Sequence, residues 1–146
     1  MPWPAALHNK EFENAPSMAV FFKYYLFAFL SFFALDLLWL GWLGKNLYRR
    51  YIGHLMRDQA DWAAALPFYL LFLAGLVYFV VQPSADSPAR LVLFRGAAFG
   101  LVTYATYELT NRAVLANWPW PIVFIDILWG IVLCALVSWV SWYFGR

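Results

Sequence analysis

Four long apolar stretches separated by short polar connectors dominate the hydrophobicity pattern of the chain. They cover residues of about 24–43, 62–81, 91–111 and 121–143. A helix of about 20 apolar residues crosses a hydrocarbon core of roughly 30 Å. The pattern therefore predicts an all-α integral membrane protein, a four-helix transmembrane bundle.

The connectors add two further elements. In residues 44–58 apolar or aromatic side chains alternate with basic ones at helical spacing, which predicts a short interfacial helix between helices one and two. This helix acts either as an anchored connector or, through Arg49 and Arg50, as a specific phospholipid or anion site. Residues 1–17 are polar and rich in proline, so the prediction is an N-terminal tail followed by one transmembrane domain over residues 18–146.

Composition supports a membrane protein. Hydrophobic residues make up 64% of the chain and charged residues 12%, whereas soluble domains have about half and about a quarter. The net charge of +2 is small and scattered, so membrane lipids are the expected partners and no nucleic acid is. Cys134 is the single cysteine and is interpreted as a packing residue. The pattern names no cofactor.

Two similar segments place an acid inside a predicted span. Asp36 lies in Ala34–Leu40 and Asp126 in Phe124–Gly130, and a tryptophan, Trp39 or Trp129, follows each aspartate three positions later. A carboxyl group within a membrane is costly and usually marks a functional site. The tryptophans either pack between helices or form the wall of a pocket for a flat or cationic ligand.

The third stretch is the most polar. Gly96 and Gly100 form a small-xxx-small pattern, which lets another helix approach its backbone closely. Polar side chains then follow at i, i+3, i+4 and i+7, on one stripe of the helix. Lipid cannot satisfy such a stripe, so it must face protein or water. Its members are Tyr104, Tyr107, Glu108 and Asn111.

Four antiparallel spans place Asp36 and Asp126 at nearly the same depth, close to the membrane face opposite the termini. The other half of the bundle is almost wholly apolar, which predicts a pocket opening at one surface rather than a continuous pore. No catalytic residue or metal ligand is assigned. The candidate ligand-binding residues are Asp36, Trp39, Tyr69, Tyr104, Tyr107, Glu108, Asn111, Arg112, Asp126 and Trp129.

Three neighbouring acids in a low-dielectric setting cannot all ionise cheaply. Some are therefore expected to be protonated, to pair with Arg112 or Lys45, or to hold a cation. The alternative interpretation is structural: Asp36 and Asp126 brace the helices through hydrogen bonds to indoles, hydroxyls or backbone groups.

Several motifs occur together in order: Ala34-Leu35-Asp36 with Trp39-Leu40, Gly53-His54-Leu55, Phe68-Tyr69, Arg95-Gly96-Ala97 with Phe99-Gly100, Thr106-Tyr107 with Leu109-Thr110-Asn111, and Asp126 with Trp129-Gly130. From about Phe21 to the C-terminus the chain resembles a bacterial membrane-protein family catalogued as domain of unknown function 2177. Glu108 stands where that pattern has an aspartate. The resemblance implies a four-helix inner-membrane protein of bacteria and carries over no catalytic residue.

Three functions remain open from the sequence. The first is binding or movement of a proton, cation or small polar ligand in an acidic pocket, where transport by four helices would need a homodimer. The second is an integral-membrane enzyme acting on a lipid-type substrate, with paired carboxylates as acid and base. The third is an accessory subunit of a larger membrane complex. Lys and Arg divide five to five between the two faces, so a cytoplasmic N-terminus is only favoured slightly.

Overall fold

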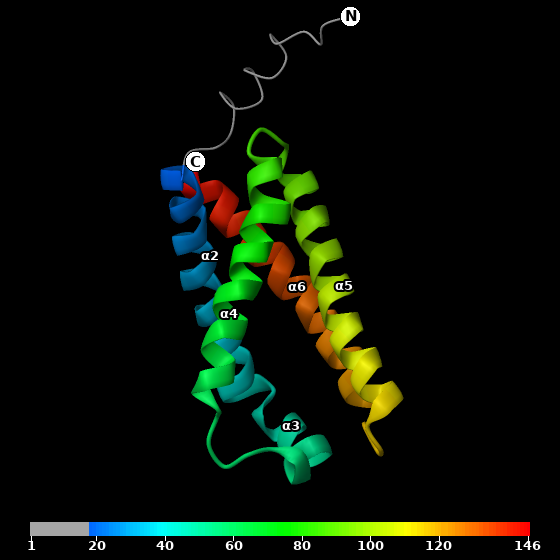
Figure 1. Ribbon diagram of the computed structural model, residues 1–146. Coiled ribbons are helices and arrows are strands. Elements are labelled where there is room, and N and C mark those ends of the chain that lie inside the picture. Colours follow the sequence, from blue (N-terminus) through cyan, green and yellow to red (C-terminus); the bar gives the residue numbers. More distant parts are fainter. Residues whose placement is uncertain (1–17) are drawn as a thin grey trace, which may run out of the picture.

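The computed structural model describes residues 18–146, and within that range the regular elements are all helical (Figure 1). The predicted N-terminal tail, residues 1–17, lies outside the described residues. The elements are α2 (Met18–Leu38) with a π-helical continuation (Trp39–Leu43), α3 (Lys45–Ile52) with a 3₁₀ turn (Gly53–Leu55), α4 (Trp62–Leu76) with a π-helical segment (Val77–Val81) and a 3₁₀ turn (Gln82–Ser84), α5 (Ala89–Val114) and α6 (Trp120–Gly145).

Three helical stretches in the described chain are long and apolar enough to cross a membrane. They are Met18–Leu43, Trp62–Ser84 and Trp120–Gly145. α5 is as long as α6, at 26 residues, but it carries four charged residues and is not one of these three. The structure thus confirms an all-helical chain with several membrane-length helices, whereas the predicted fourth span at 91–111 is not confirmed by this criterion.

The two ends of the bundle differ in what they hold. At one end, here called the terminal end, the C-terminus lies beside the start of α2 and near the turn between α4 and α5 (Figure 1). The Lys23 ammonium donates to the Arg146 carbonyl at 2.8 Å, and the Trp142 indole donates to the Ala85 carbonyl at 3.1 Å. At the opposite end, here called the α3 end, α3 lies near the start of α4 (Figure 1).

The main apolar core fills the terminal half. It is made by α2, α4, α5 and α6, and its fully buried members are Ala28, Leu73, Leu76, Val77, Val81, Val92, Leu133, Cys134 and Val137. A Cβ atom added at Gly96 would lie 2.6 Å from the Cys134 carbonyl oxygen, and one at Gly100 would overlap the Gly130 carbonyl. The small-xxx-small prediction is therefore confirmed, because these glycines let α6 lie against the α5 backbone.

A second, smaller core lies at the α3 end. Its buried members are Trp118, Ile122 and Val123, and partly buried side chains of α3 pack against them. The basic side chains of α3, Lys45, Arg49 and Arg50, are exposed on its other side. The sequence correctly predicts a short amphipathic helix here, and its apolar face covers the start of α6.

Candidate functional site

A chain of hydrogen bonds connects three elements at Asp126. Asp126 lies in the second turn of α6 and is 9% exposed. The Tyr48 hydroxyl, which comes from α3, donates to Asp126 Oδ1. The Trp39 indole, from the π-helical end of α2, donates in turn to the Tyr48 hydroxyl at 3.0 Å. α3 is therefore attached to the interior of the bundle through a single tyrosine.

Backbone geometry places Tyr48 and Trp39 next to each other. The π-helical turn closes with a bond from the Gly44 N–H to the Trp39 carbonyl at 2.6 Å. A Cβ atom at Gly44 would lie 2.9 Å from the Tyr48 ring and 3.2 Å from the Trp39 indole nitrogen. Only glycine leaves room for both side chains against the backbone at this corner.

Burial also fixes the state of the Tyr48 hydroxyl. Loss of solvent, reinforced by the hydrogen bond to the Asp126 carboxylate, raises the pKa of Tyr48 well above its ordinary value. The hydroxyl therefore stays protonated and acts as the donor to Asp126 at neutral pH.

Asp36 lies beside this chain on α2. The Tyr69 hydroxyl of α4 donates to Asp36 Oδ2 at 3.3 Å. The rings of Trp39 and Trp129 stack with centroids 4.5 Å apart and planes 10° apart. The Trp129 indole N–H interacts with Asp36, but it does not reach hydrogen-bond geometry and is buried without a hydrogen-bond partner among the described residues. The tryptophans thus pack between helices and also border the acids.

Glu108 is the most deeply buried acid in the described chain. Its side chain is 0% exposed, and the Trp118 indole donates to its Oε2 at 2.8 Å. Its other oxygen, Oε1, has no donor among the described residues. The Glu108 and Asp126 carboxyl groups interact directly with each other. Asp126 is therefore contacted by a hydroxyl from α3 and by a second carboxyl group from α5.

The cations predicted to compensate these acids lie elsewhere. The Arg112 guanidinium donates to the Trp118 carbonyl at 2.7 Å and lies over the Trp120 ring, 5.1 Å from its centroid. Within residues 18–146 the ion pairs reduce to Arg57 with Asp61, 3.4 Å apart and exposed. Of the alternatives left open by the sequence, pairing of the acids with Arg112 or Lys45 is wrong.

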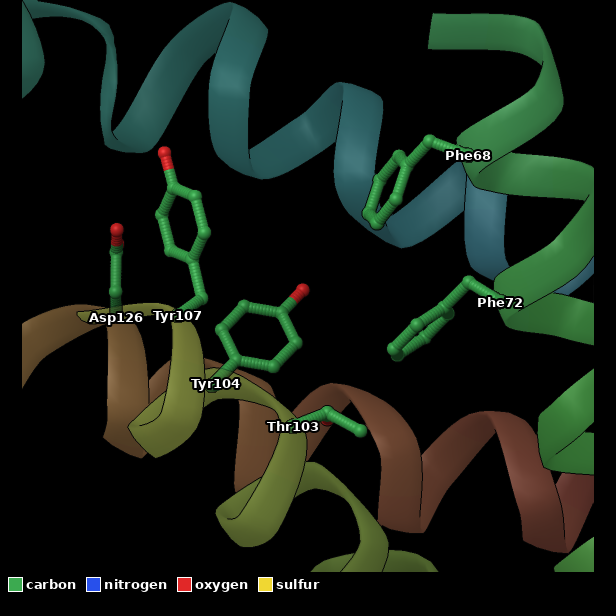
Figure 2. Close-up of a pocket in the computed structure, with 6 residues that line it drawn as sticks. All are labelled: Phe68, Phe72, Thr103, Tyr104, Tyr107 and Asp126. Carbon is green, nitrogen blue, oxygen red and sulfur yellow. The ribbon is translucent and has the colours of Figure 1, made fainter. Parts of the chain in front are cut away.

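Two cavities meet at Asp126. The larger, of about 420 Å³, is lined by Phe68 and Phe72 of α4, by Thr103, Tyr104 and Tyr107 of α5, and by Asp126 (Figure 2). The smaller, of about 190 Å³, lies toward α2 and includes Asp36, Trp39, Tyr48, Tyr69 and Trp129 in its wall. Phe68, Tyr104 and Asp126 belong to both walls.

The predicted residues divide into three groups. Seven of them line one or both cavities: Asp36, Trp39, Tyr69, Tyr104, Tyr107, Asp126 and Trp129. Glu108 contacts Asp126 but is not part of either cavity wall, and Asn111 interacts with the Tyr107 hydroxyl. Arg112 is directed to the connector before α6 and is not brought together with the acids.

Sequence reasoning missed Tyr48, Trp118, Phe68, Phe72 and Thr103. Tyr48 had a usable signal, since it lies on the apolar face of a short helix that must cover something. Trp118 follows the connector residue Asn117, whose φ of 63° marks a sharp turn. The remaining three are ordinary span residues, and only the angle between α4 and α5 makes them part of a wall.

Donor sets for a metal ion are limited in this region. Among residues 18–146 no group of three or more His, Cys, Asp or Glu side chains is placed to hold a metal ion. The three acids therefore form a contacting pair, Glu108 with Asp126, and a neighbour, Asp36, rather than one ligand cluster.

An all-helical chain with several helices of membrane length is a multi-pass membrane protein. Its residues 21–143 match the family described as "Predicted membrane protein (DUF2177)", and the chain belongs to that family. The resemblance seen in the sequence is thereby confirmed over nearly the same range. Comparison with curated proteins and comparison with solved structures each gave no match.

Proposed function

We propose that the chain is a four-span protein of the bacterial inner membrane, with α5 as the additional span and a cytoplasmic N-terminus. α5 lies along α6 through its glycines. Its charged residues suit this position, since Arg90, Arg95 and Arg112 lie toward its two ends and Glu108 is buried within the protein. The exposed basic side of α3 would then rest among lipid headgroups.

The function that this arrangement supports best is binding or movement of a proton, a cation or a small polar ligand in the acidic pocket. One observation carries the proposal. Asp126, a buried carboxyl group with no ion-pair partner in the described chain, is shared by the walls of two aromatic-lined cavities. An uncompensated acid in a low-dielectric pocket favours a positive ligand or a proton.

The test is thermal stability of the purified protein in lipid nanodiscs across pH and a panel of cations and amphiphiles. The double variant Asp36→Asn/Asp126→Asn should fold and should lose the ligand or pH response of the wild type. Asp86→Asn, at the exposed turn of the terminal end, is the matched control and should keep that response. If the wild type responds to nothing and the double variant is strongly destabilised, the aspartates are structural braces.

A second candidate function is favoured by a separate observation. Asp36 and Asp126 line the same smaller cavity, and paired carboxyl groups can act as general acid and base on a lipid-type substrate. Comparing the lipid composition of membranes with and without the protein tests this enzyme, since turnover changes composition and binding alone does not.

Movement of a ligand through so small a bundle would require a second copy or a larger complex. The outer side of α5 carries a shallow groove of about 540 Å³ that includes Val102, Ala105, Thr106 and Leu109, and this surface suits helix packing. Mass measurement in gentle detergent distinguishes a monomer from a homodimer or a complex with other chains.

A further inference from the structure

The larger cavity opens sideways between two helices. α4 and α5 are joined by a turn at the terminal end and separate toward the α3 end (Figure 1). In the space between them, Phe68 and Phe72 of α4 face Tyr104 of α5 (Figure 2). Phe68 and Tyr107 remain 53% and 59% exposed, so the outer part of this wall is open. In a membrane that opening faces the bilayer, and a ligand can enter from lipid.

The wall offers aromatic surface and very little polarity. The Thr103 hydroxyl donates to the Phe99 carbonyl of its own helix at 2.8 Å, so it has no donor left for a ligand. Charge enters the wall only through Asp126, at its inner end. A molecule that fills this cavity is therefore apolar along most of its length and positive at one end, where a carboxyl group and aromatic rings both favour a cation.

Glu108 provides an independent indication of a positive group. It is fully buried, its Oε1 has no donor in the described chain, and it interacts with the Asp126 carboxyl group. Two facing carboxyl groups cannot both ionise cheaply, so the pair suits a single positive charge. A phospholipid headgroup fits poorly, because its phosphate would approach Asp126 and Glu108.

We propose that the ligand is a single-chain amphiphile with a cationic amine head, which enters from the bilayer between α4 and α5 and places its amine against Asp126. This inference rests on the proposed binding function and narrows it to one ligand class. Tyr48, Tyr104 and Tyr107 also face this acid, with Asp36 nearby, and none of them adds positive charge.

The test uses the full chain in nanodiscs and an alkylamine of about 12 carbons that carries a photoreactive diazirine. Labelled residues are mapped by mass spectrometry, with dodecylamine, dodecanol and propylamine as competitors. We expect labelling to concentrate on the cavity residues of α4 and α5. Dodecylamine should compete, whereas the neutral dodecanol and the short propylamine should not.

Two variants test the two parts of the site. Asp126→Asn removes the charge and should lower saturable labelling about tenfold or more. Thr103→Phe fills the cavity and should have a similar effect. Thr106→Phe is its matched control, because Thr106 also donates to its own helix, to the Val102 carbonyl at 2.6 Å, but lines the outer groove of α5 instead. If Thr103→Phe does not fold, Asp126→Asn decides.

Labelling spread evenly over all helices, equal competition by dodecanol, or labelling unchanged in Asp126→Asn would overturn the inference. The proposed function survives that result if the nanodisc protein still responds to pH or to another ligand through its acids. Loss of both the amine binding and every such response would remove the inference and the proposed function together.

Discussion

The terminal half and the α3 half of this bundle are held together by different means. In the terminal half α2, α4, α5 and α6 share an apolar core, and glycines bring α5 and α6 into backbone contact. In the α3 half α4 and α5 are apart (Figure 1), and the elements are linked by side-chain hydrogen bonds from Trp39, Tyr48, Tyr69 and Trp118 to one another or to acids.

The difference shows how a small membrane protein can hold an open, polar region. Buried acids do not by themselves hold helices together, because each needs partners that offset its desolvation. Here the tightly packed half supplies the stability, and the other half tolerates two cavities and an acid pair. Substitutions should therefore destabilise the protein most in the terminal half and alter ligand response most in the α3 half.

The largest expected effect is that of Gly100→Ala. The added methyl group would overlap the Gly130 carbonyl, a backbone atom that cannot rotate away. We expect a loss of at least about 3 kcal/mol of unfolding free energy, at the upper end of ordinary overpacking costs. Reversible unfolding in mixed micelles measures it. Gly41→Ala is the control, since nothing lies within 4 Å of its added atom, and equal losses in both variants would contradict the contrast.

Next in size is Trp118→Phe at the α3 end. It removes the indole that donates to Glu108 Oε2 at 2.8 Å and leaves a fully buried carboxyl group with fewer partners. The expected loss is about 2 kcal/mol. Trp62→Phe, at a tryptophan that is 63% exposed, should change stability by less than about 0.5 kcal/mol in the same assay. Similar losses at the two positions would show that the indole bond to Glu108 contributes little.

Tyr48→Phe should have a somewhat smaller effect, about 1–2 kcal/mol, because it removes one bond to Asp126 and one from Trp39. The loss should be local. Amide hydrogen exchange should accelerate in α3 and in the π-helical segment of α2, and it should remain unchanged in the terminal half. Tyr51→Phe, on the same helix, is the control. Faster exchange throughout the bundle would show that α3 supports the whole fold rather than its own end.

The smallest effect is the pH dependence of that difference. The folded state raises the Tyr48 pKa, so above the ordinary value of 10.0 the unfolded chain loses this proton first. Stability from Tyr48 is thus complete below pH 10 and falls above it, by up to about 1.4 kcal/mol per pH unit. The gap between wild type and Tyr48→Phe should narrow from pH 9 to pH 11. A constant gap would mean that the hydroxyl ionises equally in both states.

The sequence was informative where a pattern is local or periodic. Apolar runs predicted the helices to within a few residues, and the spacing of Gly96 and Gly100 predicted the close approach of a second helix. The common depth of Asp36 and Asp126 followed from helix direction alone, and both acids line one cavity.

The rest depends on angles and side-chain directions that periodicity does not contain. The charge of Arg112 suggested a partner for the acids, but its side chain reaches the Trp118 carbonyl instead. The contact between Glu108 and Asp126 requires knowing which faces of α5 and α6 meet. The cavity wall from Phe68 and Phe72 arises because α4 separates from α5, and no residue in either helix announces that separation.

The π-helical segment Trp39–Leu43 has a consequence for comparing related chains. A π turn holds one residue more than the α-helical turn that could replace it. Deleting a single residue there would let the helix continue as α, and everything after it would rotate by about 100°. Tyr48 would then point away from Asp126 although its own sequence neighbourhood is unchanged. In an alignment of relatives, a one-residue gap at this place therefore marks a chain whose short helix covers the bundle with a different face.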